Sequence, residues 1–176
     1  MLTQATSSTE IFYSVLDESM TFVVNEHYSK LSKSVHPTQF IFPNETIVSQ
    51  CLSSRLSIGA FHEGELIGCR LSYSPGLADE NLGYFFSLPE DELRQTIQYQ
   101  GTSVLPDYRG KGVGNELHKR SIQLIQKSEY RSITVTCHPD NKPSLHQLHK
   151  LGFKEDKQIH IVKGKERYVF LKRLEK

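Results

Sequence analysis

The most informative part of this sequence is the stretch Tyr99-Gln-Gly-Thr-Ser-Val-Leu-Pro-Asp-Tyr-Arg-Gly-Lys-Gly-Val-Gly114. It starts as an extended run that ends at Pro106, and the part from Arg109 to Gly114 opens a helix. A loop of this kind leaves backbone N–H groups unpaired at the positive end of the helix dipole, where they suit a pyrophosphate. The glycines leave room for phosphates, and Arg109 and Lys111 add positive charge. The stretch therefore predicts a phosphate-binding turn between a strand and a helix.

A glycine-bearing turn that binds nothing is the alternative interpretation, because turns of this composition are common. Two other nucleotide signatures are excluded by the spacing. The phosphate loop G-x-x-x-x-G-K-[ST] is absent because Lys111 is followed by Gly112. The dinucleotide fingerprint G-x-G-x-x-G does not fit either, since Gly110, Gly112 and Gly114 alternate.

A second informative segment follows an apolar strand and reads Asn141-Lys-Pro-Ser-Leu-His-Gln-Leu-His-Lys-Leu-Gly-Phe153. The spacing Arg-x-x-Gly-x-Gly after a strand, followed by this Asn-helix-Leu-Gly-Phe segment, closely resembles the GNAT family of N-acetyltransferases. The resemblance is sharp from about residue 96 to residue 153. It implies an α/β fold, in which a mixed central sheet with splayed parallel strands is flanked by helices, and it implies acetyl-CoA as cosubstrate.

The resemblance also implies which residues hold acetyl-CoA. By analogy, backbone groups of Thr102, Ser103 and Val104 pair with the pantetheine arm, and Asn141, with Ser144 in the same segment, steadies that arm near the thiol. The turn that holds the pyrophosphate consists of Arg109, Gly110, Lys111, Gly112, Val113 and Gly114. Gly101 predicts a bulge or a close backbone approach in the strand that splays to admit the arm.

The general acid is the point at which this chain departs from the family. Many members have a Tyr seven residues after the Asn, and that position is Leu148 here. His149 is adjacent and is the candidate catalytic acid, and His146 lies one turn earlier; the alternative is that both are surface positions. A side-chain acid is also dispensable, because a thiolate is a tolerable leaving group that Ser103 and the backbone could support.

No general base stands out. An acidic cluster could attract a cationic amine or relay its proton through water, although acidic residues are also favoured in the first turn of a helix; its members are Asp79, Glu80, Glu90, Asp91 and Glu92. The consecutive aromatics Tyr84, Phe85 and Phe86 could wall an acceptor pocket or fill a core. His138 either points into the cleft or ends its strand, and with His146 and His149 it completes no recognisable metal site, so no metal is expected.

Length and composition limit the number of domains, the kinds of partner and the cellular location that we expect. The length fits one domain over residues 1–176, and the net charge of +1 predicts no nucleic-acid or membrane partner. The start of the chain lacks a basic, apolar leader, and no stretch approaches the ~20 apolar residues that span a bilayer. Cys51, Cys69 and Cys137 predict reduced, buried thiols and a cytoplasmic location. A monomer or homodimer is expected.

Periodicity predicts the remaining elements. A capping box at Ser7 and Glu10 starts a first helix with an apolar stripe from Phe12 to Val23. Asn44 caps a second helix. The other expected elements are a hairpin over 56–61 and 66–73, a short helix near 87, strands over 96–105 and 133–137, helices over 112–127 and from 143, and a last hairpin turning at Gly164.

The sequence therefore predicts an N-acetyltransferase that moves the acetyl group of acetyl-CoA to a primary amine by direct nucleophilic attack. A small-molecule acceptor is favoured over a peptide N-terminus or a lysine. The alternative is a CoA-binding sensor or partner module without transferase activity, which the missing Tyr and the missing base motivate.

Overall fold

The computed structural model describes residues 10–36 and 39–175. Seven strands form one sheet in the order β1-β2-β3-β4-β5-β7-β6, in which β4 and β5 are parallel and the other neighbours are antiparallel. The strands are β1 Phe12–Leu16, β2 Ser57–His62, β3 Glu65–Tyr73, β4 Thr96–Val104, β5 Ser132–Cys137, β6 Lys154–Val162 and β7 Lys165–Arg173. The expected mixed α/β sheet is confirmed.

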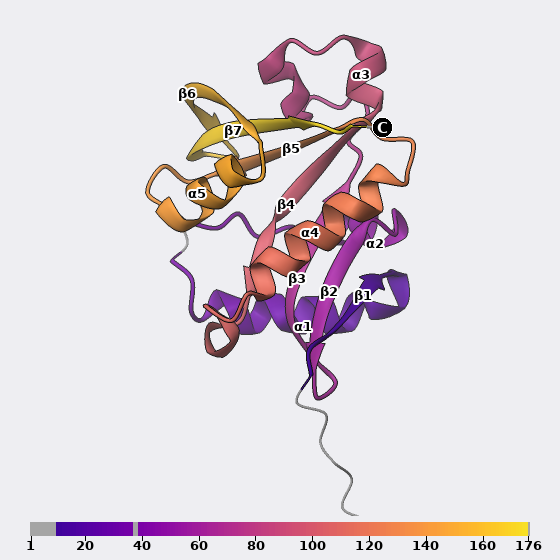
Figure 1. Ribbon diagram of the computed structural model, residues 1–176, viewed down its shortest axis with the longest axis vertical. Coiled ribbons are helices and arrows are strands. Elements are labelled where there is room, and N and C mark those ends of the chain that lie inside the picture. The colour runs from indigo at the N-terminus through magenta and orange to yellow at the C-terminus, as the bar shows by residue number, and fades with distance from the viewer. Residues whose placement is uncertain (1–9, 37–38, 176) are drawn as a thin grey trace, which may run out of the picture.

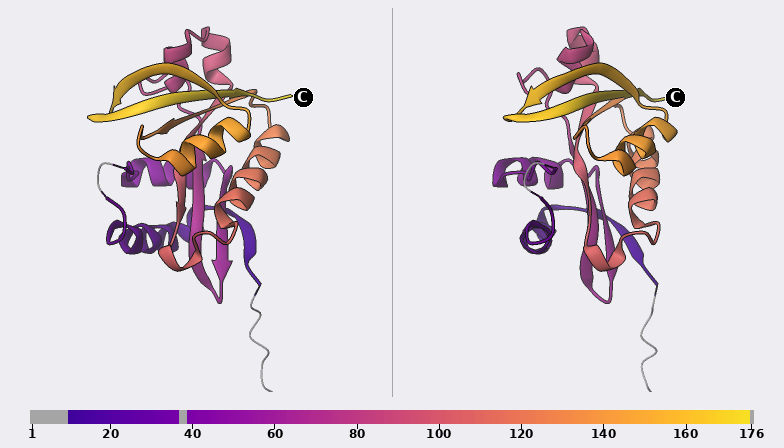
Figure 2. Two further views of the ribbon diagram at one scale, coloured as in Figure 1. Left: turned by 60° about the vertical axis from the view of Figure 1, so that its left-hand side comes forward. Right: turned by 90° about the vertical axis from the view of Figure 1, so that its left-hand side faces the viewer.

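Helices cover both faces of this sheet. The α-helices are α1 Thr21–Ser32, α2 Glu45–Ser53, α3 Glu90–Arg94, α4 Val113–Gln126 and α5 Lys142–Lys150, with short 3-10 turns η1 Glu18–Met20, η2 Leu82–Phe86 and η3 Pro106–Tyr108. Figure 2 shows α1 and α2 on one face and α4 and α5 on the other. Burial of apolar side chains between these layers is the main favourable term in folding.

The gap between β4 and β5 is the feature of the sheet that positions the site. The two strands pair only from Thr96 to Gln98, against Ser132 to Thr134, and then diverge (Figure 1). Gly101 lies at a register shift between β3 and β4 and has φ +96°. A Cβ there would lie 3.1 Å from the ring of Phe40, so the expected bulge and close approach are both confirmed.

The first predicted helix is wrong over its N-terminal half. Residues Phe12–Leu16 form β1, which pairs antiparallel with β2, and the α-helix begins only at Thr21. Ser7, the proposed cap, lies outside the described residues. The segment contains aromatic and β-branched residues, and pairing with the β2 edge satisfies backbone groups that periodicity does not consider. Asp17 starts the η1 turn instead, since its side chain accepts a hydrogen bond from the Ser19 N–H.

Most other expected elements are confirmed. The Asn44 side chain accepts a hydrogen bond from the Ile47 N–H and so caps α2. The short helix α3 begins at Glu90, three residues later than expected from Ser87. Cys51, Cys69 and Cys137 are free and buried. In the part of the chain that the structure describes, no helix has both the length and the apolar character to cross a bilayer.

Candidate active site

A large cleft, called the main cleft here, lies where α4 begins, where β4 leaves β5 and where α5 begins. Its volume is about 790 Å³. The structure brings ten of the predicted cosubstrate residues to this one cleft; they are Thr102, Ser103, Val104, Arg109, Gly110, Gly112, Val113, Gly114, Asn141 and Ser144. Two segments that are far apart in the sequence thus border the same hollow.

The turn before α4 presents backbone rather than side chains. Gly110 and Gly112 have φ of +73° and +83°, and a Cβ on either would meet no atom within 4 Å, so the space beside them is open. No side chain caps the helix at Gly112. The first N–H groups of a helix lack intrahelical partners, so this turn offers them to an anion.

The two basic residues of the turn differ in position. The Arg109 Nε donates to the Val104 carbonyl at 3.0 Å, which ties the turn to the end of β4. Lys111 does not line the main cleft; its ammonium lies 5.4 Å from the centroid of the Tyr108 ring. Lys111 therefore adds positive charge beside the main cleft without lining it.

Asn141 has a structural task that ties it to Ser144. The Asn141 Oδ1 accepts a hydrogen bond from the Ser144 N–H at 3.3 Å and so caps α5. Both residues border the main cleft. The cap fixes the orientation of the Asn141 amide group at the mouth of the gap between β4 and β5.

The Ser103 hydroxyl is committed to the core. The His27 Nδ1 lies 2.9 Å from the Leu66 carbonyl and must donate to it, so the His27 Nε2 is an acceptor. The Ser103 hydroxyl donates to that Nε2 at 2.8 Å. Burial lowers the pKa of His27, which is consistent with a neutral ring. Ser103 thus offers backbone groups to a ligand, and its hydroxyl points away.

Leu148 and His149 lie in different surroundings. Leu148 is buried in the core cluster that also contains Tyr99 and Phe153, and one side of it borders the main cleft. The His149 imidazole is half-exposed, and its Nε2 lies 3.1 Å from the Glu155 carboxylate. His149 does not line the main cleft, whereas His146 does. The structure therefore does not bring the candidate acid His149 together with the cosubstrate residues.

Arg70 is a cleft residue that the sequence analysis missed. It is 1% exposed, its Cζ lies 3.7 Å from the centroid of the Tyr99 ring, and its Nη2 donates to the His118 Nδ1 at 2.6 Å. In the described part of the chain, its Nε and Nη1 are the buried side-chain nitrogen or oxygen atoms without a hydrogen-bond partner. The signal was an arginine inside the apolar run Leu66-Ile-Gly-Cys-Arg-Leu71.

Burial and the charge of Arg70 together keep the neighbouring His118 ring neutral. Burial lowers the pKa of Arg70 to about 10. Burial, followed by the nearby Arg70 charge, lowers the pKa of His118 to about 2, so the ring is neutral. Because its Nδ1 accepts from Arg70, its Nε2 carries the proton and donates to the Thr102 Oγ1 at 3.2 Å. The contacts from Arg70 through His118 therefore fix the side chain of Thr102 beside the gap between β4 and β5.

A smaller hollow, called the side pocket here, joins the main cleft on the other side of the gap. Its volume is about 90 Å³. The residues that border both hollows include Gly101, Thr102, Thr136, Asn141 and Ser144. The side pocket is also lined by His138, Lys163 and Arg167, and none of its described lining residues is Asp or Glu.

The acidic cluster and the aromatic run lie elsewhere. None of Asp79, Glu80, Glu90, Asp91 and Glu92 lines either hollow, and Glu92 pairs with Arg173. The Tyr84 hydroxyl donates to the Leu77 carbonyl at 3.0 Å, and the Phe85 ring lies 4.3 Å from that of His160. Among the residues with described positions, no group of three or more His, Cys, Asp or Glu side chains could hold a metal ion.

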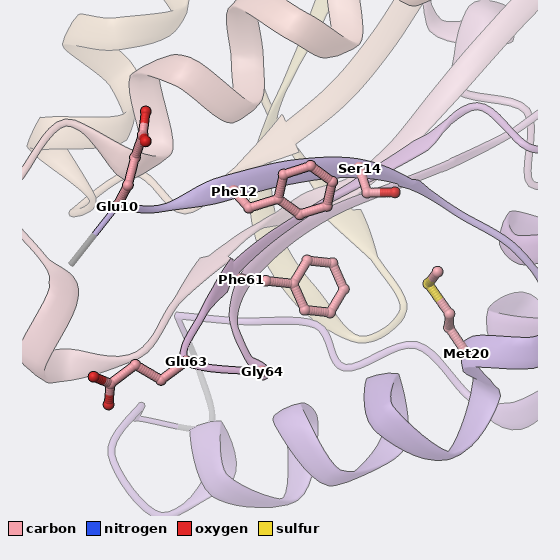
Figure 3. Close-up of a pocket in the computed structure, with 7 residues that line it drawn as sticks. All are labelled: Glu10, Phe12, Ser14, Met20, Phe61, Glu63 and Gly64. Atoms are coloured by element: carbon pink, nitrogen blue, oxygen red, sulfur yellow. The ribbon is translucent and has the colours of Figure 1, made fainter. Parts of the chain in front are cut away.

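A third hollow of about 710 Å³ lies beside β1, away from this site. Figure 3 shows the residues that line it, which come from β1 and the segment just before it, β2, η1 and the β2–β3 turn, and which include Phe12, Phe61 and Met20. None of the predicted site residues lines it. Its lining is largely apolar but includes Glu10 and Glu63, and none of its described lining residues is Lys or Arg.

Solved structures with the same fold are acetyltransferases. A putative acetyltransferase of Salmonella typhimurium, solved with its cofactor acetyl-CoA, has a TM-score of 0.69 at 16% identity, and the match covers 94% of each chain. A putative acetyltransferase of Acinetobacter baylyi has a TM-score of 0.69 at 17% identity, covering 97% of this chain and 95% of that one. At this identity the likeness concerns the fold.

Sequence comparison supplies the family. An uncharacterized N-acetyltransferase of Methanocaldococcus jannaschii is 30% identical over 73 residues, which is 42% of this chain and only 31% of that protein. The profile described as the Acetyltransferase (GNAT) family matches residues 23–153, which include β4, the glycine turn, α4, β5 and α5. The chain belongs to the GNAT family of acetyltransferases.

Proposed function

We propose that this protein is an N-acetyltransferase that uses acetyl-CoA to acetylate the primary amine of a small molecule by direct attack. One observation carries the proposal: the main cleft and the side pocket meet at the gap between β4 and β5. A donor in one hollow and an acceptor in the other would face each other there. Such positioning replaces a bimolecular encounter by an effectively unimolecular one.

The main cleft suits the donor. The acetyl-CoA-bound neighbour and the family assignment support acetyl-CoA as cosubstrate. In this proposal the N–H groups from Gly110 to Gly114 hold the pyrophosphate, and backbone groups of Thr102, Ser103 and Val104 pair with the pantetheine arm. Asn141 orients the arm at the gap, with Ser144 beside it. When bound, acetyl-CoA supplies an activated acetyl group.

The side pocket suits a small acceptor. Its volume of about 90 Å³ is below the size of typical drug-sized ligand pockets and fits a compact amine better than a folded protein tail. The amine must be neutral to attack, and no carboxylate among the described lining residues is placed to take its proton. We therefore assign deprotonation to water at the gap rather than to a side chain.

The proposal is tested by two measurements on the purified protein. Isothermal titration with acetyl-CoA should give micromolar binding, and release of the CoA thiol should then be followed against a panel of small amines. Turnover with at least one amine is expected. Absence of acetyl-CoA binding would contradict the proposed donor site.

A specific observation favours the alternative that the protein binds CoA without transferring an acetyl group. Leu148 stands where many relatives have their acid, it is buried, and neither hollow is lined by a described carboxylate. A CoA-binding sensor or partner module would show micromolar binding of acetyl-CoA and no thiol release above the uncatalysed rate with any amine. That result would replace the enzyme proposal by the module.

A further inference from the structure

The side pocket is lined by basic side chains, which is unusual for a site that binds an amine. The side chains of Lys163 and Arg167 line it, together with the partly buried imidazole of His138. Among the lining residues with described positions there is no carboxylate. A protonated amine entering this hollow would therefore meet positive charge and no carboxylate of a described lining residue, which costs free energy in a partly desolvated site.

Arg167 is the most buried of these cations. It is 2% exposed, and its Nη1 donates to the Glu166 carbonyl at 2.7 Å. Burial lowers the pKa of Arg167, although a guanidinium stays charged at neutral pH. A guanidinium has five N–H donors in a planar fork that matches a carboxylate, so it can keep protein contacts and still bind an anion.

Lys163 occupies a backbone position that lysine does not favour. It has φ +49° and is followed by Gly164 with φ +73°, so these two residues form the tight turn between β6 and β7. A two-residue turn with both φ positive strongly prefers Asn-Gly or Asp-Gly. The turn places Lys163 among the residues that line the side pocket.

His138 adds an N–H donor where β5 ends, on the strand that pairs with β7. Its Nδ1 lies 3.1 Å from the Asp140 N–H and accepts from it, so the Nε2 carries the proton. The Asp140 carboxylate lies 4.0 Å from the same Nδ1, but Asp140 is exposed and does not line the pocket. Two cations and one N–H donor therefore border the hollow into which the proposed acceptor enters.

We infer that the acceptor is an amine that also carries an acidic group, a carboxylate in the first instance, and that Arg167 and Lys163 bind that group. The inference rests on the proposed function and specifies its substrate class. The carboxylate neutralises the basic pocket and orients the amine toward the gap at Thr136 and Asn141. Diamines and other polycationic amines are excluded by repulsion.

The same arrangement aids the chemistry without a protein base. Positive charge near an ammonium group favours its neutral form, because a nearby like charge disfavours the charged state. The acceptor's carboxylate offsets much of the charge of Lys163 and Arg167, but its pairing with them also removes the stabilisation that it gives its own ammonium group in solution, so the bound amine loses its proton to water more readily. This effect accounts for a site in which none of the described lining residues is a carboxylate.

The test compares acceptors that differ only in the carboxylate. Acetyl transfer is measured for leucine against 3-methylbutylamine, β-alanine against ethylamine, and 4-aminobutyrate against propylamine, with 1,4-diaminobutane as the dication. At least one carboxylated member should exceed its partner by roughly 10-fold or more in kcat/KM, as a charge-assisted contact implies. The diamine should be the poorest acceptor.

Lys163→Asn is the decisive variant. Asparagine suits the turn, so the melting temperature should stay the same or rise, while kcat/KM falls roughly 5-fold for carboxylated amines only. Lys157→Gln, which removes an exposed lysine of β6 that does not line the pocket, is the matched control and should change neither quantity. Arg167→Gln should cause a larger loss, with its fold checked by circular dichroism.

The outcomes separate the two proposals. Acetylation with no preference for carboxylated amines, or a preference for the diamine, overturns this inference and leaves the proposed function standing. Acetyl-CoA binding without acetylation of any amine overturns the proposed function. In that case calorimetric titration of the three matched pairs of amines into the CoA-loaded protein decides the inference: selective binding of the carboxylated members supports it, and equal or absent binding overturns it.

Discussion

The main cleft and the side pocket are built from different parts of the polypeptide. The part of the main cleft assigned to the pantetheine arm and the pyrophosphate depends on backbone: the diverging strand β4, the glycine turn and the start of α4, which follow one another in the chain. The side pocket depends on side chains from separate segments, since Gln39, His138 and Arg167 meet there. A site built from backbone groups can bind the same acetyl donor in proteins of different sequence. A site built from side chains can bind a different acceptor once one of those side chains is substituted.

The largest expected effect is a loss of acetyl-CoA affinity when the phosphate-binding turn of the main cleft is blocked. Gly112→Leu places a side chain in the open space where the helix N–H groups point, and we expect acetyl-CoA affinity to fall roughly 1,000-fold, or about 4 kcal/mol. Isothermal titration measures this loss.

Gly64→Leu is the matched control for that variant. Gly64 has φ +81° and open space around its Cβ position, so the backbone cost is similar, but it lies in the β2–β3 turn. Its acetyl-CoA affinity should match the wild type. Equal loss in both variants would mean that strain, rather than blocked phosphates, caused the effect.

A smaller effect is expected from the core that supports the cleft. Leu148→Ala should lower the free energy of unfolding by about 3 kcal/mol, because Leu148 is 2% exposed and packs in a core cluster. Urea denaturation gives this value. A change below about 1 kcal/mol would show that Leu148 faces the open cleft, in which case a tyrosine there would be tolerated.

The buried Arg70 side chain is expected to lower the free energy of unfolding of the ligand-free protein. Arg70→Met should raise the free energy of unfolding by about 2 kcal/mol, because a buried cation with two unpaired nitrogens is replaced by an apolar side chain of similar length. Denaturant melts of the ligand-free protein test the sign. Destabilisation would mean that the contacts of Arg70 with Tyr99 and His118 outweigh its desolvation.

The smallest expected effect near neutral pH is the pH dependence of the free energy of unfolding. Because the folded-state pKa of His118 is lowered from 6.5 to about 2, the unfolded chain binds a proton below pH 6.5 that the folded ring does not. His118 therefore contributes full stability above pH 6.5 and loses about 1.4 kcal/mol per pH unit as the pH falls below that value. His118→Gln should flatten the acid side of the stability curve. An unchanged slope would show that the ring is not buried as a neutral group.

The comparison of the two hollows also explains what could be predicted from the sequence. The glycine turn, the bulge at Gly101 and the cap at Asn44 are local patterns, and the structure confirms their geometry. The helix expected over Phe12–Leu16 was wrong, because pairing with β2 is a long-range contact. Arg70 and Lys163 were missed, because burial and pocket lining depend on which distant segments meet.

The most direct test of this account is a backbone amide NMR titration of the isotope-labelled protein, first with CoA and then with 4-aminobutyrate. The account predicts that CoA shifts the amides of Gly110, Gly112 and Gly114, and that 4-aminobutyrate then shifts those of Lys163 and Arg167. Shifts centred on the β1 hollow around Phe12, or no shift of the glycine amides with CoA, would contradict it.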